Sequence, residues 1–336
     1  MSSTTTAPPA AAPSKEDRRG LADLWLRYPT LGPLIALAIA VVIFSLTSST
    51  FMNIDNMSLV LQQTIVIATL ALGQTLVILT AGIDLANAAI MVLGSLLFAK
   101  LAAQGQPPLL ALVAGFAVCT VIGAVSGALV TRLKLPPFIV TLGLLTVVTA
   151  LGRLYSDGNS WPVTSDLLGY LGKGSYLFGQ FYVTPGMFVM LAMFGIVWYA
   201  LSHTAWGKHV YAVGNDEEAA RLTGIHVRQT LFSVYVVAGL IYAVAAWQAL
   251  GRIPNADPNA FQTGNLDSIT AVVIGGTSLF GGRGGVWGTL VGALIVAVLR
   301  SGLTQAGIDS LYQDVATGLL VIAAVAFDQW ARRRAL

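Results

Sequence analysis

The segment "SLVLQQTIVIATLALGQTLVILT" (residues 58–80) contains no charged residue and is apolar over most of its length. The hydrocarbon core of a bilayer is about 30 Å thick and each helical residue rises by about 1.5 Å, so a membrane-spanning helix needs about 20 mostly apolar residues. This segment is long enough to cross a bilayer as a single helix. It predicts a membrane protein.

The same pattern recurs along the chain. Of its 336 residues, 56% are hydrophobic and only 10% are charged, and the mean hydropathy is +0.76. This composition is typical of polytopic helical membrane proteins and excludes an ordinary soluble domain. We predict an all-α fold with about ten spans, at residues 31–50, 58–80, 88–103, 109–131, 138–155, 183–202, 230–250, 268–280, 286–300 and 311–327. The eighth segment is short, and the sequence leaves open whether it crosses the bilayer fully or turns back.

The positions of lysine and arginine predict the orientation, because these residues gather in cytoplasmic loops. An even number of spans places both termini on one side of the membrane. If that side is the cytoplasm, the cytoplasmic segments hold most of the 18 lysines and arginines, namely Lys15, Arg18, Arg19, Arg27, Arg132, Lys134, Lys208, Arg221, Arg228, Arg283, Arg332, Arg333 and Arg334. We therefore expect a disordered N-terminal tail (1–28), a membrane domain (29–330) with a cytoplasmic loop (203–229), and a basic C-terminal tail (331–336).

The cytoplasmic loop contains one short polar segment, "AVGNDEEAARLTGI" (residues 212–225). Its pattern predicts a helix of about two turns, with an N-cap, acids in the first turn, a glutamate at the capping-box position and a glycine that ends the helix in a left-handed cap. The residues in this order are Asn215, Asp216, Glu217, Glu218, Ala219, Ala220, Arg221 and Gly224. A helix this short is marginal in water on its own. It is therefore either held against its own protein or docked on a cytoplasmic partner, with the alanines permitting close approach.

This segment resembles the coupling segment in the permease subunits of bacterial ABC importers for monosaccharides, of the ribose and xylose type. Three further segments are similar to motifs of that family and occur in the expected order: "LTAGIDLANAAIMVLGS" (79–95), "LPPFIVTLGLL" (135–145) and "LDSITAVVIGGTSLFGGRGGVWGTLVGALI" (266–295). The resemblance implies a homodimeric permease in the inner membrane of a bacterium, with an ABC ATPase below it. It also implies a periplasmic or lipid-anchored sugar-binding protein above it.

Glycines are concentrated around the short eighth span, at Gly275, Gly276, Gly281 and Gly282 among others. Glycine permits positive φ and close backbone approach, which suits a broken helix inside a transporter. The segment lacks the lysine and the spacing of a phosphate-binding loop, so no nucleotide site is expected on this chain. The resemblance implies that these glycines shape the translocation path close to the coupling segment.

Four polar residues occur in or beside apolar spans, and we treat them as candidates for the translocation path. Asp84 lies between two spans, where a buried acid must be paired or solvated, so it either caps a helix or belongs to a gate. Asn87 can donate and accept the hydrogen bonds that a sugar hydroxyl requires. Gln74 and Thr141 either bond to neighbouring helices or contact the sugar.

The sequence predicts no catalytic residue, no metal site and no cofactor bound by this chain, because no paired catalytic groups are found and His203, His209 and His226 form no convincing ligand set. No contact with nucleic acid is expected. The resemblance implies import of a monosaccharide, a pentose or hexose, with ATP hydrolysed by the partner ATPase. Permeases for nucleosides, an autoinducer-like furanose or branched-chain amino acids are alternatives. A secondary transporter is a further alternative, and it would need an ion-coupling acid deep in a span.

Overall fold

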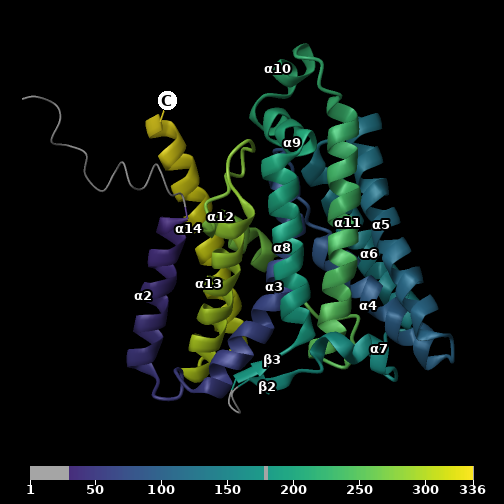
Figure 1. The fold of residues 1–336 in the computed structure, drawn as a ribbon, viewed down its shortest axis with the longest axis vertical. Helices are drawn as coiled ribbons and strands as arrows, with labels where there is room; N and C mark the ends of the chain where they lie inside the picture. The colour runs from purple at the N-terminus through teal and green to yellow at the C-terminus, as the bar shows by residue number, and fades with distance from the viewer. Residues whose placement is uncertain (1–29, 178–180, 336) are drawn as a thin grey trace, which may run out of the picture.

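The computed structural model describes residues 30–177 and 181–335, so the predicted N-terminal tail (1–28) lies outside the described residues. The described chain is mainly helical (Figure 1). Its longer helices are α2 (Leu31–Thr47), α3 (Ile54–Leu79), α4 (Asn87–Ala103), α5 (Pro108–Arg132), α6 (Pro137–Ser156), α8 (Pro185–His203), α9 (Ala205–Asn215), α11 (Val227–Arg252), α12 (Gly264–Ile274), α13 (Val286–Gln305) and α14 (Ser310–Ala335). The short elements are α7 (Asp166–Gly169), the 3₁₀ helix η2 (Tyr170–Gly172), α10 (Glu217–Leu222), β1 (Trp161–Pro162), β2 (Ser175–Leu177), β3 (Phe181–Val183) and β4 (Asn255–Ala256).

Each predicted span overlaps one of these helices, although residues 275–280 of the predicted eighth span are not helical. Six helices, α3, α5, α6, α8, α11 and α13, are long and apolar enough to cross a membrane, and α2, α4, α12 and the first part of α14 are shorter apolar helices. A polytopic helical membrane protein is therefore confirmed. Helix α14 continues through residues 331–335, which the sequence suggested as a tail.

Several helix starts follow from local chemistry. Helix α3 is capped by Asn53, whose side chain accepts a hydrogen bond from the backbone N–H of Asp55 (3.3 Å). Helices α5, α6 and α8 each begin with proline, at Pro108, Pro137 and Pro185. Proline is well suited to the first helical turn because no backbone N–H is needed there.

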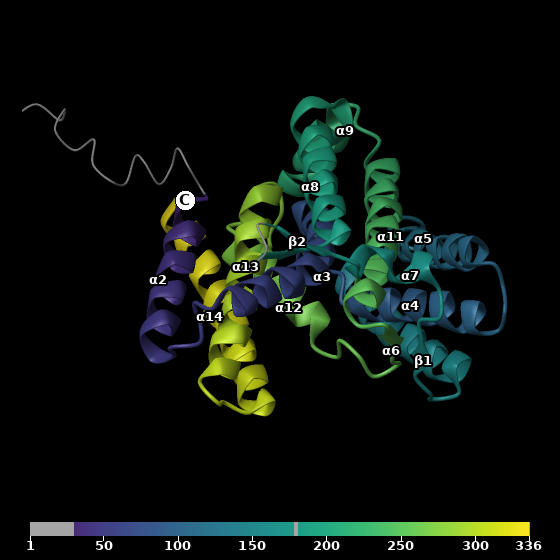
Figure 2. The same ribbon diagram turned by 60° about the horizontal axis from the view of Figure 1, so that its bottom comes forward.

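Helix α3 is the centre of the bundle. In the most apolar 18-residue stretch of α3, 78% of the residues are buried, against 22–28% in the corresponding stretches of α5, α6 and α8. Figures 1 and 2 show α2, α13 and α14 on one side of α3 and α4, α5, α6 and α11 on the other. Every residue from 64 to 79 is buried, as expected for a helix that is apolar on all faces.

Small residues bring two helix pairs into close contact. At Gly123 in α5 a Cβ atom would clash with the backbone carbonyl of Tyr235 in α11. At Gly292 in α13 it would clash with the backbone carbonyl of Ala271 in α12. Gly123 and Gly292 are therefore positions where only a residue without a side chain permits the helices to pack this closely.

The all-α prediction missed two small sheets in the connecting loops. Strand β1 pairs with β4, and β2 pairs with β3, both antiparallel. Strands of two or three residues are too short to show an alternating pattern, so the sequence gives no signal for them. The β1–β4 pair joins the loop before α8 to the loop before α12.

The eighth predicted span is a half-length helix. Helix α12 has 11 residues, about 16 Å of helix, which is about half the thickness of the hydrocarbon core. It begins four residues earlier than predicted and ends at Gly275, because the chain turns at Gly276 with φ +86°. The predicted broken helix is therefore confirmed, and the chain leaves α12 through a loop at residues 275–285, which we call the glycine loop.

An ion pair fixes the start of α12. The buried Asp267 side chain accepts a hydrogen bond from Nη2 of Arg300 in α13 at 2.9 Å, and the same nitrogen lies 2.9 Å from Oγ1 of Thr263. A carboxylate this deeply buried is tolerated only when it is paired.

We predict that Gly292→Ala lowers the free energy of unfolding by about 1–3 kcal/mol, because the added methyl group overpacks the α12–α13 contact. Thermal unfolding of the purified protein in detergent measures this effect. Gly195→Ala in α8 is the matched control, since nothing lies within 4 Å of the added atom. Equal midpoints for the two variants would contradict the proposed close contact.

Candidate functional site

The segment that connects α3 to α4, residues 80–86, is not helical, yet most of it is buried. Ala81 has φ +59°, an uncommon conformation for a residue with a side chain. Buried backbone groups need hydrogen-bond partners, especially in a membrane protein, where lipid supplies none. We call residues 80–86 the 80–86 segment.

Side chains from other helices supply partners for three successive carbonyls of this segment. Oγ1 of Thr141 in α6 donates to the carbonyl oxygen of Ile83 (2.9 Å). The carboxamide of Gln74 in α3 lies against the backbone of Asp84, with its NH₂ 2.9 Å from the carbonyl oxygen and its oxygen 3.2 Å from the backbone nitrogen. Nδ2 of Asn265 in α12 donates to the carbonyl oxygen of Leu85 (3.3 Å).

The Asp84 side chain is 1% exposed and paired on both oxygens. Oδ1 accepts a hydrogen bond from the backbone N–H of Ala86 (2.9 Å), the residue that precedes α4. Oδ2 accepts a hydrogen bond from the hydroxyl of Tyr242 in α11 (3.1 Å). The geometry is that of a helix cap with an additional phenol donor.

Asn87, the first residue of α4, links this segment to the half-length helix. Its Nδ2 donates to Oγ of Ser268 in α12 (2.7 Å), and the whole side chain is buried. Gln74, Asp84, Asn87 and Thr141 are therefore brought together, as a group, around the 80–86 segment. All four are buried in this conformation and hold the backbone in place.

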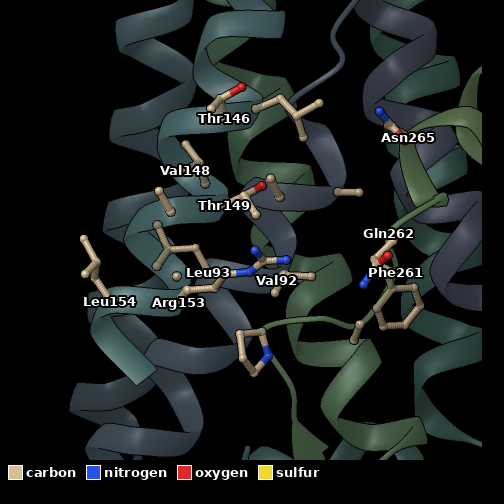
Figure 3. Close-up of a pocket in the computed structure, with 17 residues that line it drawn as sticks. Val92, Leu93, Thr146, Val148, Thr149, Arg153, Leu154, Phe261, Gln262 and Asn265 are labelled. Atoms are coloured by element: carbon tan, nitrogen blue, oxygen red, sulfur yellow. The ribbon is translucent and has the colours of Figure 1, made fainter. Parts of the chain in front are cut away.

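A cavity of about 730 Å³ lies next to this network, and we call it the outer cavity. It is bounded by α4, by α6 and by the residues around the start of α12 (Figure 3). Ala88 and Ala89 line it directly after Asn87. Asn265 both lines the cavity and binds the carbonyl of Leu85, so it connects the cavity to the 80–86 segment.

The outer cavity combines an apolar wall with a few polar side chains. Figure 3 shows Arg153 extending from α6 into the space, with Gln262 and Asn265 across from it. Thr149 from α6 also lines the cavity. Phe261, beside Gln262, has φ +53°, and strained residues of this kind cluster at functional sites.

A second cavity, of about 500 Å³, borders residues 80–82 of the 80–86 segment, and we call it the inner cavity. It is lined by Ala81 and Gly82, by Pro136 and Pro137 at the start of α6, and by Tyr235 in α11. Asp216 and Glu217 of the predicted coupling segment also line it. The outer and inner cavities therefore both border α6. The inner cavity is lined by residues 80–82 of the 80–86 segment, and the outer cavity is lined by the first turn of α4 that follows it.

The glycine loop contacts the coupling segment, but only through two of the four glycines named from the sequence. The backbone N–H of Gly282 donates to the carbonyl oxygen of Leu79 at the end of α3 (3.0 Å). A Cβ atom on Gly282 would lie 2.8 Å from Cα of Asn215, and one on Gly281 would lie 2.5 Å from the carbonyl oxygen of Gly214. Gly275 instead packs against Gly288 in α13. Gly276 is exposed.

The predicted short helix is present as α10, with its start shifted by one residue. Asp216 is the N-cap, since its Oδ1 accepts a hydrogen bond from the backbone N–H of Ala219 (2.9 Å). Asn215 instead ends α9, a helix that the sequence did not predict because its residues were taken as loop. Glu218 does not complete a capping box and pairs with Arg221. That hydrogen bond raises the pKa of Arg221, which therefore stays charged.

Helix α10 has one face against its own protein and one face exposed. Ala220 is buried against Val213 and Val227, so it is not available to a partner as the sequence suggested. Ala219 is exposed, and Leu222 is 78% exposed. The helix ends, as predicted, at a left-handed glycine, Gly224, with φ +86°.

Sequence reasoning missed the polar residues that line the outer cavity. Arg153 lies near the end of a predicted span (138–155), where a cation gives no functional signal, and Gln262 and Asn265 lie in a segment that resembles an ordinary loop. Tyr242, the phenol that binds Asp84, is indistinguishable in sequence from any interfacial or core tyrosine. Only the fold brings these positions together.

Comparison with known proteins agrees with this architecture. The family model described as the permease component of branched-chain amino acid transport systems matches residues 56–325. The fructose import permease protein FrcC of Rhizobium meliloti is 44% identical over 91% of this chain and 86% of its own length. The ribose import permease protein RbsC of Bacillus subtilis is 40% identical, over 89% of this chain and 92% of its own. The D-allose transport system permease protein AlsC of Escherichia coli is 32% identical, over 91% and 92%.

No solved structure matches the chain. The relatives confirm the resemblance to permeases of monosaccharide importers, and they are transport subunits, not enzymes. Together with the apolar helices, they identify a multi-pass protein of the bacterial inner membrane. The chain belongs to the family of permease components described for the branched-chain amino acid transport systems.

Proposed function

We propose that this chain is the membrane-spanning permease subunit of an ATP-driven importer that moves a monosaccharide, a pentose or hexose, into the cytoplasm. The relatives named for fructose, ribose and allose support the substrate class. The observation that carries the mechanism is the 80–86 segment, because its residues 80–82 line the inner cavity and its Leu85 carbonyl is bonded to Asn265, which lines the outer cavity. A solute-binding protein delivers the sugar to the outer side.

The outer cavity has the chemistry expected of a transient sugar site. Amides such as those of Gln262 and Asn265 both donate and accept hydrogen bonds, as sugar hydroxyls do. The apolar wall and the ring of Phe261 cover the less polar face of a sugar ring. Only a few polar side chains line this large cavity, so the sugar binds weakly enough to be released.

The 80–86 segment is the barrier in this proposal. Its carbonyls are held by Thr141, Gln74 and Asn265, which belong to three different helices. A shift of α6 or α12 breaks the hydrogen bonds that these helices make to the carbonyls and allows the 80–86 segment to move. The sugar then passes from the outer cavity, past Asn87, to the inner cavity beside Tyr235.

Movement is driven from the cytoplasmic side through α10. The exposed face of α10 docks on a separate ABC ATPase, which binds and hydrolyses ATP, and this chain binds no cofactor. The buried face of α10 packs against Val213 at the end of α9. The next two residues of α9, Gly214 and Asn215, contact Gly281 and Gly282 of the glycine loop. The glycine loop binds Leu79, one residue before the 80–86 segment. Nucleotide bound to the ATPase shifts the equilibrium between the outward-open and the inward-open conformation of the transporter, because its affinity for the two conformations differs.

The proposal includes the assembly. We place ten spans with both termini in the cytoplasm, a tail at residues 1–28, and two copies of the permease. Thr146 and Arg153 are exposed on α6 in this single chain, and an arginine facing lipid is costly. This face of α6 therefore meets a second copy or a water-filled path.

Transport by proteoliposomes tests the function directly. The permease is reconstituted with its ATPase and binding protein, and uptake of labelled fructose, ribose and allose is compared with uptake of leucine and a nucleoside. ATP-dependent uptake of one of the sugars is the expected result. Uptake confined to leucine or the nucleoside would contradict the proposed substrate class, and uptake driven by an ion gradient without ATP would indicate a secondary transporter.

We predict that Gln262→Ala raises the KM for sugar uptake about three- to tenfold, the effect of losing one hydrogen bond, with an unchanged melting temperature. Initial rates in proteoliposomes measure KM. Gln106→Ala, on the exposed loop between α4 and α5, is the control and leaves KM unchanged. If both variants behave like the wild type, Gln262 does not contact the sugar.

We predict that Thr141→Val increases the passive efflux of preloaded sugar, without ATP, by about tenfold, because it leaves the carbonyl of Ile83 without its donor. The change is nearly isosteric, so packing of α6 is retained. Thr120→Val in α5, which loses only a hydrogen bond within its own helix, is the matched control. Efflux equal to that of the control would remove Thr141 from the barrier.

We predict that Glu217→Lys and Leu222→Asp each reduce retention of the ATPase during co-purification by about tenfold or more, because they alter the charge and the apolar contact of the exposed α10 face. The permease itself remains folded, which its melting temperature shows. Leu177→Asp, an exposed leucine in β2, is the control and leaves retention unchanged. Normal retention by both α10 variants would mean that α10 is an internal support.

A further inference from the structure

A third cavity, of about 460 Å³, lies outside the proposed sugar path. It is formed by the end of α8, the start of α13 and the glycine loop, and Thr30 lies at its edge. These elements meet towards the end of the molecule that carries α9 and α10 (Figure 1). Nothing in the proposed transport mechanism uses this cavity.

The polar groups around the cavity suit an anion. Arg283 lines the cavity, and no acidic side chain among the described residues pairs with it. None of the lining residues is acidic, whereas Ser202 and Tyr211 contribute hydroxyl groups. The hydroxyl of Tyr211 donates to the carbonyl oxygen of Gly284 (2.9 Å), which fixes the position of the phenol at the wall.

The backbone adds to this positive character. Helix α13 has 20 residues, and its N-cap, Gly285, makes no side-chain cap. The first residues of α13, Val286, Trp287 and Gly288, line the cavity, and a helix N-terminus favours negative charge. Behind the wall, the buried hydroxyl of Thr277 packs against Gly284 and has no hydrogen-bond partner among the described residues.

Aromatic residues indicate that the anion belongs to a lipid. Trp198 and Trp287 line the cavity and are each 41% exposed, and Tyr199 beside them is 59% exposed. Exposed tryptophan and tyrosine at the ends of membrane helices typically lie at the level of the lipid headgroups. The cavity is therefore placed where a headgroup phosphate, with its acyl chains still in the bilayer, can reach Arg283.

We propose that this cavity binds the headgroup phosphate of an anionic phospholipid from the cytoplasmic leaflet, with Arg283 as its charged partner. The chain's own residues 1–29 are a less suitable occupant, although the chain reaches the cavity edge at Thr30. That segment contains four cations, Lys15, Arg18, Arg19 and Arg27, and only three acids, so its charge does not complement Arg283. The inference does not depend on the transported substrate.

Fluorescence quenching tests the proposal. The purified full-length permease is placed in phosphatidylcholine nanodiscs that contain an increasing fraction of brominated phosphatidylglycerol, and tryptophan emission is recorded. We expect saturable quenching at a low fraction of phosphatidylglycerol, weakened about tenfold by Arg283→Gln and less by Arg283→Lys. Arg132→Gln, an exposed arginine at the end of α5, is the matched control and leaves the quenching curve unchanged.

The double variant Trp198→Phe, Trp287→Phe shows where the lipid binds. We expect it to lose the saturable quenching, because the quenched tryptophans are those that line the cavity. Melting temperatures show whether each variant is folded. Equal quenching by brominated phosphatidylcholine, or an Arg283→Gln curve identical to the wild type, would overturn the proposal. Displacement of the lipid by millimolar inorganic phosphate would assign the site to a soluble anion instead. Saturable quenching that appears only after deletion of residues 1–29 would assign it to the chain's own tail.

Discussion

The backbone carbonyls of residues 83–85 are the constraint on which the centre of this protein depends. They lie in a non-helical, largely buried connection, where no helix supplies their hydrogen-bond donors. Thr141, Gln74 and Asn265 provide the donors from three separate helices. The polar residues of these apolar helices are thereby explained by the need to satisfy one piece of backbone.

The same connection relates the two ends of the molecule. Asn265 belongs both to the outer cavity and to the hydrogen bonds of the 80–86 segment. At the end of the bundle that carries α10, the glycine loop binds Leu79 and contacts Asn215. These contacts form a continuous physical route from the exposed face of α10 to the wall of the outer cavity. Direct contacts of this kind are what a coupled transporter requires, and each of them is a hydrogen bond or a close packing contact.

The sequence predicted the membrane helices well because bilayer thickness imposes a length and a polarity on every span. It also predicted the short α12 and the left-handed Gly224, since glycine is the residue that such turns require. It misplaced the N-cap at Asn215 because asparagine and aspartate are nearly equivalent caps, and only the extended backbone of Asp216 decides between them. The outer cavity was not predictable, because Arg153 and Gln262 are far apart in the chain and line one cavity only because α6 and the segment before α12 both lie beside α4.

Hydrogen–deuterium exchange of the peptide that covers residues 80–88 tests the central claim most directly. The permease is compared in complex with its ATPase, first without nucleotide and then with ATP and the loaded binding protein. The account predicts slow exchange in the resting complex, although the segment is not helical, and clearly faster exchange during turnover. Equal protection in the two states would show that the segment is a fixed part of the scaffold and would contradict its role as the barrier.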